Sequence, residues 1–154
     1  MEPHLSVSED SRINNFDIRM LSRAIKVAGQ STFHQFKTGC VITYKRHIIS
    51  MAHNVDKTSP AQKKYNKYRH FNHHNLVQHK THAEILALNK VPYPIGIQVN
   101  WSKANIYIAR IAPGLKNGLG FSRPCPACMN AIKDIGIKNI FYTTEDGIAY
   151  ERIN

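Results

Sequence analysis

The stretch Thr81-His82-Ala83-Glu84-Ile85-Leu86-Ala87-Leu88 lies near the middle of a chain of 154 residues. It opens with a threonine, a residue type that caps helices, continues with apolar residues at helical spacing, and is followed by Pro92. The pattern predicts a helix that Thr81 caps and Pro92 stops. Two side chains able to bind metal or to move protons, His82 and Glu84, then belong to its first turn.

The segments on either side follow helix and strand patterns in a regular order. Apolar residues recur at helical spacing between Asn14 and Gly29, and two β-rich runs are separated only by Lys45-Arg46. The expected elements are a helix at 14–28, strands at 39–44 and 47–52, a helix at 82–91, a strand at 105–110, a helix at 125–135, and strands at 139–143 and 148–153. This order predicts an α/β fold with a mixed five-stranded sheet flanked by helices and a C-terminal β-hairpin.

The length and composition are those of one domain. The chain has a mass of 17.6 kDa, with 42% apolar and 20% charged residues. We expect a flexible arm at 1–13 and one domain at 14–154, with a partly helical, lysine-rich insert at 56–80 that faces the substrate. The insert histidines are interpreted as a solvated surface, with a second zinc site as the alternative: His70, His73, His74 and His79.

The charge is strongly positive. A net charge of +11 and a pI near 9.8 permit binding of polyanions or steering of a phosphorylated small molecule.

No apolar run reaches the length of a membrane span, and the N-terminus lacks the pattern of a signal peptide. We therefore expect a soluble, cytoplasmic protein with no membrane partner.

The three cysteines indicate metal or redox chemistry rather than a disulfide framework, which would leave one over. Two of them stand in Pro124-Cys125-Pro126-Ala127-Cys128, at the start of a predicted helix. Cysteines three positions apart can turn both sulfurs to one side of a helical turn, where the positive helix end favours thiolates. With His82 as a third ligand, the set suits zinc.

Three protein ligands are typical of a catalytic zinc, because a structural zinc has four and is closed. The open position holds a water whose pKa zinc lowers to about 7. Residues two apart on a helix do not share a face, so Glu84 is badly placed to bind the metal beside His82. It is better placed to take a proton from the water and pass it to a leaving group.

These motifs resemble the zinc-dependent cytidine and deoxycytidylate deaminase superfamily, with its H-x-E and P-C-x-x-C signature. The resemblance rests on His82-Ala83-Glu84-Ile85 and on residues 124–128, in this order, and extends over about residues 15 to 153. Gly39-Cys40-Val41-Ile42 is similar to the first strand of the family, with Cys40 in place of the usual alanine. Asn54 falls where family members hold the substrate sugar.

The resemblance implies a cytidine deaminase-like three-layer fold and separate metal-binding, catalytic and substrate-binding residues. It implies that His82, Cys125 and Cys128 bind Zn²⁺ and that Glu84 is the catalytic acid and base. The residues that it places at the substrate are Asn54, Cys40 near the base pocket, Ala83 and Pro124.

The leading functional prediction is a hydrolytic zinc deaminase that converts cytosine to uracil in a free pyrimidine nucleoside or nucleotide such as dCMP. The first alternative is a cytosine or adenine deaminase acting on single-stranded DNA or RNA, so nucleic acid stays open as a partner. The second is an inactive zinc-containing binding module, against which the presence of Glu84 argues. A homo-oligomer also stays open.

Overall fold

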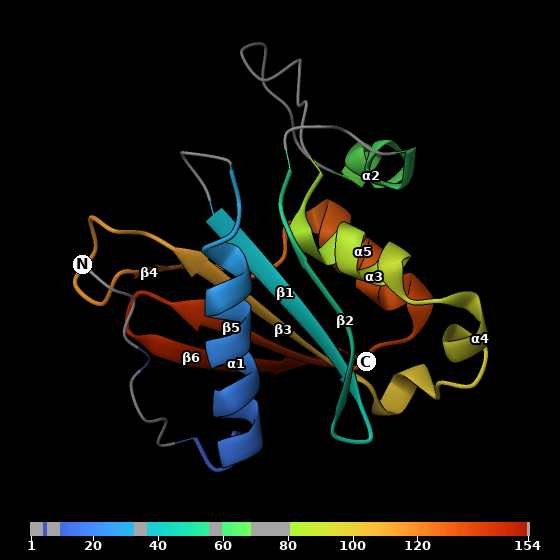
Figure 1. The fold of residues 1–154 in the computed structure, drawn as a ribbon, viewed down its shortest axis with the longest axis horizontal. Coiled ribbons are helices and arrows are strands. Elements are labelled where there is room, and N and C mark those ends of the chain that lie inside the picture. Colours follow the sequence, from blue (N-terminus) through green and yellow to red (C-terminus); the bar gives the residue numbers. More distant parts are fainter. Residues whose placement is uncertain (1–4, 6–9, 33–36, 56–59, 69–80, 154) are drawn as a thin grey trace.

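The computed structural model describes residues 5, 10–32, 37–55, 60–68 and 81–153 (Figure 1). Most of the predicted arm at 1–13 and all four histidines of the insert lie outside these ranges. The helices are α1 (Asn15–Ala28), α2 (Pro60–Tyr65), α3 (Ala83–Lys90), α4 (Tyr93–Gly96) and α5 (Pro126–Ile135), with short 3-10 turns η1 (Asn66–Tyr68) and η3 (Trp101–Lys103). The strands are β1 (Lys37–Tyr44), β2 (His47–His53), β3 (Asn105–Ile111), β4 (Leu119–Gly120), β5 (Asn139–Thr144) and β6 (Gly147–Arg152).

The strands form one mixed, open sheet in the order β2-β1-β3-β5-β6. Strands β3 and β5 are parallel and the other pairs are antiparallel, including the predicted hairpins β1-β2 and β5-β6. The five predicted strands are confirmed, and β4 adds a sixth beside β3. Strand β4 has only two residues, which is too short for an alternating pattern to show in a sequence.

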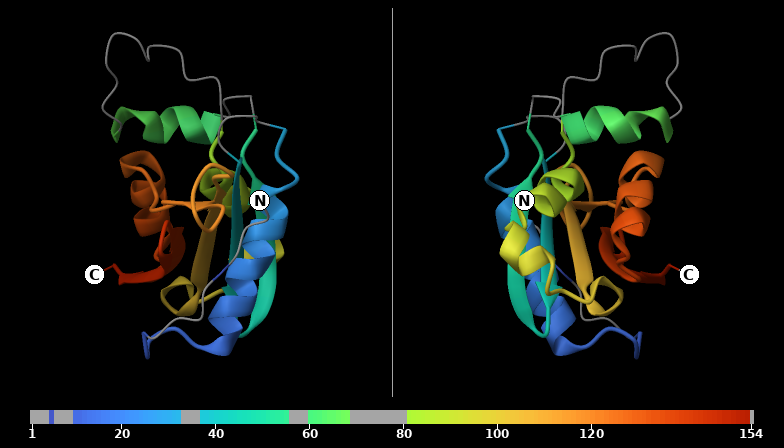
Figure 2. Two further views of the ribbon diagram at one scale, coloured as in Figure 1. Left: turned by 90° about the vertical axis from the view of Figure 1, so that its left-hand side faces the viewer. Right: turned by 90° about the vertical axis from the view of Figure 1, so that its right-hand side faces the viewer.

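Helices cover both faces of the sheet and make three layers (Figure 2). On one face, Val41, Tyr107 and Phe141 lie in register across β1, β3 and β5 and pack with α1. On the other face, Cys40, Ile42, Ile106 and Ile108 pack with residues of α3 and α5. Because both faces are covered, the middle of each strand is continuously apolar, at residues 40–42 of β1 and 106–109 of β3.

Helix α1 is fixed on the sheet by its first turn. Asn14 and Asp17 form a capping box, and Asp17 also accepts a hydrogen bond of 2.7 Å from the Tyr107 hydroxyl of β3. Gly39 allows the close approach, because a Cβ there would lie 2.2 Å from the carbonyl oxygen of Ala24. The start of β1, which borders the site described below, is thus held against α1.

The start of α3 differs from the prediction. Thr81 does not cap the helix; its N–H and C=O pair with Val55 in an isolated bridge, and His82 is the N-cap, without a side-chain capping bond. The bridge draws Thr81 into extended backbone, so the helix starts one residue later. The helix ends at Lys90, before Pro92, as predicted. None of the helices in the described ranges is long and apolar enough to cross a membrane.

Candidate active site

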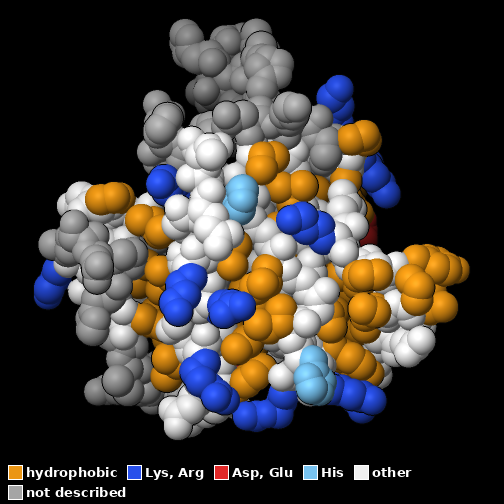
Figure 3. All heavy atoms as spheres, in the orientation of Figure 1, with side chains coloured by type: hydrophobic (Ala, Val, Ile, Leu, Met, Phe, Trp, Pro, Cys, Tyr) orange, Lys and Arg blue, Asp and Glu red, His pale blue; other side chains and the backbone are white. Residues whose placement is uncertain are grey.

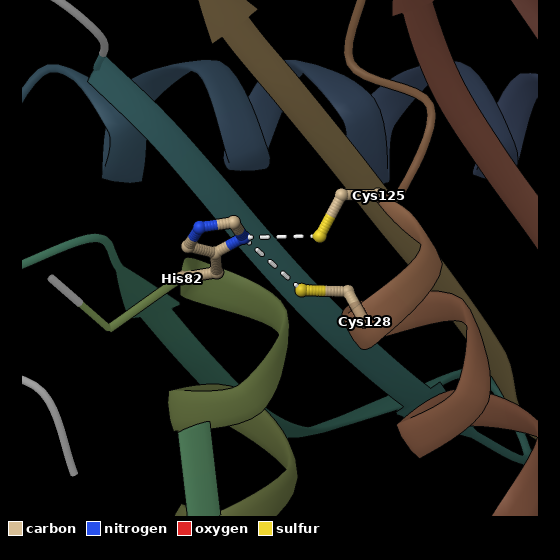
Figure 4. Close-up of side chains that lie close together, drawn as sticks. All are labelled: His82, Cys125 and Cys128. Carbon is tan, nitrogen blue, oxygen red and sulfur yellow. Dashed lines mark hydrogen bonds between the residues drawn. The ribbon is translucent and has the colours of Figure 1, made fainter. Parts of the chain in front are cut away.

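Two helix starts meet at the edge of the sheet and bring three ligand atoms together. His82 precedes α3, Cys125 is the N-cap of α5, and Cys128 lies in the first turn of α5. The Nδ1 atom of His82 is 3.5 Å from the Sγ of Cys125 and 3.3 Å from the Sγ of Cys128 (Figure 4). The ligand atoms of the three residues all lie within 4.8 Å of one another.

This donor set fits zinc. With bonds of about 2.3 Å to sulfur and about 2.0 Å to nitrogen, tetrahedral zinc holds its nitrogen and sulfur ligands about 3.5 Å apart. Both sulfurs approach the same ring nitrogen, which has one lone pair or one proton to share. A cation between the three atoms would satisfy all of them at once.

The surroundings of the two cysteines favour a thiolate at Cys125 and a thiol at Cys128. The hydrogen bond from Cys128 lowers the pKa of Cys125 to about 3, against the effect of burial. Burial raises the pKa of Cys128 well above its usual value. The positive N-terminal end of α5 adds to the stabilisation of a thiolate at Cys125.

Glu84 lies in the first turn of α3 and is 4% exposed. Burial raises the pKa of this carboxyl, while neighbouring His82 acts in the opposite direction. Its carboxylate is not among the atoms that converge between the histidine and the two cysteines. A buried carboxyl beside the ligand set, with a raised pKa, is suited to accept and return a proton.

A cavity of about 230 Å³ opens at this place. His82, Glu84 and Cys125 line it, so the candidate ligands and the candidate proton carrier share one space. The other lining residues come from strand ends, loops and the start of α3: Thr38, Asn54, Ala83, Arg110, Phe121, Ser122 and Arg123.

Comparison with known proteins decides the family. The model of the cytidine and deoxycytidylate deaminase zinc-binding region matches residues 14–144. The chain belongs to this family. The match makes zinc the cofactor, and His82, Cys125 and Cys128 form its candidate site.

Solved structures agree with this family assignment at the level of the fold. The dCMP deaminase of cyanophage S-TIM5 in apo form is 19% identical, with a TM-score of 0.52, over 82% of this chain and 81% of that one. The same enzyme in complex with dCMP and dUMP is 17% identical, with a TM-score of 0.53, over 89% and 85% of the two chains. A search of curated proteins found no match. The cytidine deaminase fold predicted from the motifs is therefore confirmed.

Of the four residues predicted to bind substrate, Asn54 and Ala83 line this cavity. The Oδ1 of Asn54 accepts hydrogen bonds from the Ser31 hydroxyl, at 2.7 Å, and from the Thr38 amide, at 3.0 Å. These bonds fix the side chain at the end of β2, on the cavity wall.

Cys40 and Pro124 are not in the lining. Cys40 is fully buried in the core on the α3 side of the sheet, where burial, with a smaller effect of Glu84, raises the pKa of its thiol. Pro124 is buried before α5. Direct contact with a substrate is therefore not supported for these two residues.

Two arginines of the cavity wall were missed in the sequence. Arg110 lies near the end of β3, and Arg123 precedes the Pro124 motif. The Nε of Arg123 donates to Glu151 of β6 at 2.8 Å. The chain has 21 lysines and arginines, and nothing local distinguishes these two from the rest.

The described part of the insert, residues 60–68, does not line the cavity, and the prediction that the insert faces the substrate stays a prediction for its remaining residues, which lie outside the described ranges. Lys63, Lys64 and Lys67 are exposed, but none of them lines the cavity. Gln62 is fully buried instead. Helix α2 of the insert packs on α3 and α5. The sequence did not predict this packing, because residues 56–80 have no clear apolar periodicity.

Proposed function

We propose that this protein is a zinc-dependent hydrolytic deaminase that converts the cytosine of a free nucleotide such as dCMP to uracil, with release of ammonia. One observation carries the proposal: two of the candidate zinc ligands, His82 and Cys125, line the same small cavity as a buried glutamate and two arginines. Such a site can hold a metal, a proton and an anionic group at once.

The proposed chemistry divides between the metal and Glu84. When held by His82, Cys125 and Cys128, zinc supplies the Lewis acidity that makes water a nucleophile near neutral pH. Glu84 accepts a proton from this water at a carboxylate oxygen and delivers protons to the ring nitrogen and to the leaving amine. Water adds to the ring carbon, the carbon–nitrogen bond to the exocyclic amine breaks, and ammonia leaves.

We assign Asn54 to the substrate sugar. Its Oδ1 is already held by Ser31 and Thr38, so the side-chain amide is fixed in one orientation. The fixed side chain lies on the cavity wall, where it can contact a sugar hydroxyl. A fixed side chain loses little conformational entropy when substrate binds.

We assign Arg123, with Arg110 beside it in the lining, to the phosphate. A guanidinium has five N–H donors, and the bond to Glu151 uses one of them while it orients the group. Phosphate binding by arginine is charge-assisted and directional. A free nucleoside has no partner for these groups, which is why we favour a nucleotide.

Replacement of this arginine tests the assignment. Arg123→Gln is expected to raise the KM for dCMP at least about tenfold, as for the loss of a charged hydrogen bond, and to change the KM for deoxycytidine little. Arg152→Gln is the matched control, because Arg152 is an exposed arginine of β6 outside this cavity. Equal effects on nucleotide and nucleoside would contradict a phosphate contact.

The substrate class itself is tested by turnover of a panel of nucleosides, nucleotides and single-stranded oligonucleotides, with ammonia and product mass as readouts. The dCMP and dUMP bound by the cyanophage enzyme make dCMP the first compound to assay. We expect dCMP to be the better substrate, with a modest dependence on salt. Faster turnover of an oligonucleotide that collapses with salt would contradict the proposal.

A deaminase of single strands is the second candidate, and the positive charge favours it. Arg19, Arg23 and Lys26 form an exposed stripe on α1, and Lys and Arg side chains spread over this face of the molecule (Figure 3). However, α1 covers the face of the sheet opposite to α3 and α5 (Figure 2). A strand held along this stripe would lie across the sheet from the ligand set, so we rank this candidate second.

A further inference from the structure

Gln62 of α2 is a fully buried polar residue next to the candidate zinc site. Its Oε1 accepts a hydrogen bond of 2.9 Å from the main-chain N–H of His82, and its Nε2 donates to Oδ1 of Asn66 at 2.8 Å. Glutamine is seldom buried completely, because its amide must then be satisfied inside the protein. Gln62 therefore forms a specific connection between the insert and the main chain of a zinc ligand.

The main chain of His82 is held from several directions. Thr81, the residue before it, pairs with Val55 through hydrogen bonds of 3.0 and 3.1 Å, and the carbonyl of His82 accepts from Leu86 at 3.1 Å. The N–H of His82 is directed to Gln62. The histidine stands at a helix start without a side-chain cap, so these main-chain bonds fix its position.

The other end of α2 reaches the helix that carries the cysteines. The Tyr65 hydroxyl donates to Oδ2 of Asp134 in α5 at 2.8 Å. Ala61 and Tyr65 also pack against a small core cluster that contains Cys128 and Ile85. Helix α2 thus contacts both α3 and α5, across whose ends it lies (Figure 2).

We propose that α2 is a brace between the two ligand-bearing helices, and that Gln62 is a positioning residue that sets the place of His82 and thereby the affinity for zinc. This inference rests on the proposed zinc site. Its physical basis is preorganisation: partners that hold a ligand in place commonly change metal affinity by about 10- to 100-fold when they are removed. Gln62 acts here through the main chain of the ligand.

The test is the zinc dissociation constant of the full-length holoprotein, measured by competition with a chelator of known affinity. Gln62→Met keeps the length of the side chain but cannot accept the N–H of His82, and should weaken zinc binding about tenfold. Gln62→Glu retains an oxygen acceptor and should restore most of the affinity. Tyr65→Phe, on the same helix, removes the bond to Asp134 but leaves Gln62 in place, and should keep the affinity of the parent.

The outcomes separate the brace from the proposed function. A parent protein that binds no zinc would contradict the proposed function itself. A parent that binds zinc, with Gln62→Met equal to it in affinity and lower only in melting temperature, would overturn the brace alone. An equal loss of affinity in Tyr65→Phe would overturn the specific role of Gln62, because the loss would then follow from any weakening of α2. Should Gln62→Met fail to fold, Asn66→Ala removes the Oδ1 that accepts from the Gln62 amide and so loosens this side chain. A smaller loss of affinity would then support the brace, and an unchanged affinity would overturn it.

Discussion

Glu84→Gln is expected to lower kcat for deamination by at least about a hundredfold, the scale of a lost general acid and base, while the protein keeps one zinc per chain. The glutamine has the shape of the glutamate but cannot carry a proton between water and the leaving amine. The carboxylate of Glu84 is also not among the converging ligand atoms of His82, Cys125 and Cys128. Turnover and elemental analysis of the same preparation measure both parts of this expectation.

Thermal unfolding provides the control for Glu84→Gln. Glu84 is buried, and burial disfavours its charged form, so a neutral amide of the same size should not lower the melting temperature. A folded variant with little activity and full zinc would therefore locate the defect in proton transfer. Loss of zinc would show that the carboxylate is a ligand, and unchanged turnover would show that another group carries the proton.

The second large effect is expected from Cys125→Ala, which should abolish stoichiometric zinc binding and reduce deamination to background. The candidate site offers three protein ligands, so removal of one would leave only two to hold the metal. Cys125 has the lowered pKa of the pair and is the thiolate at the helix start. Zinc per chain, measured after purification without added metal, is the readout.

The chain offers a matched control in its third cysteine. Cys40→Ala removes a thiol from the core, outside the ligand set, at a position where the family usually has alanine. This variant should keep one zinc per chain and most of the activity. Equal zinc contents in Cys125→Ala and the parent would exclude Cys125 as a ligand, whereas zinc loss in Cys40→Ala alone would place the metal elsewhere.

Local sequence patterns are enough to predict the order of the helices and strands and a candidate metal motif. Helix α1, both hairpins and the helix after Pro124 follow from local patterns, because capping residues, alternation and turn residues act over a few positions. The site residues His82, Glu84, Cys125 and Cys128 can be predicted for a similar reason, because few residue types bind zinc or carry protons and each motif lies within one turn of helix. The structure brings the ligand atoms of His82, Cys125 and Cys128 together.

The residues around this motif could not be predicted in the same way, because they come from distant segments of the chain. Arg110 and Arg123 join the cavity because β3 and the loop before α5 end at the same edge of the sheet. Thr81 was read as a helix cap, but its pairing partner, Val55, is far away in the sequence. Gln62 lies in the insert that the sequence predicts to face the substrate, yet its side chain accepts the N–H of His82, twenty residues away. In each case the contact joins segments that are distant along the chain. Its free energy depends on how the whole chain packs, so a pattern within a few neighbouring residues cannot predict it.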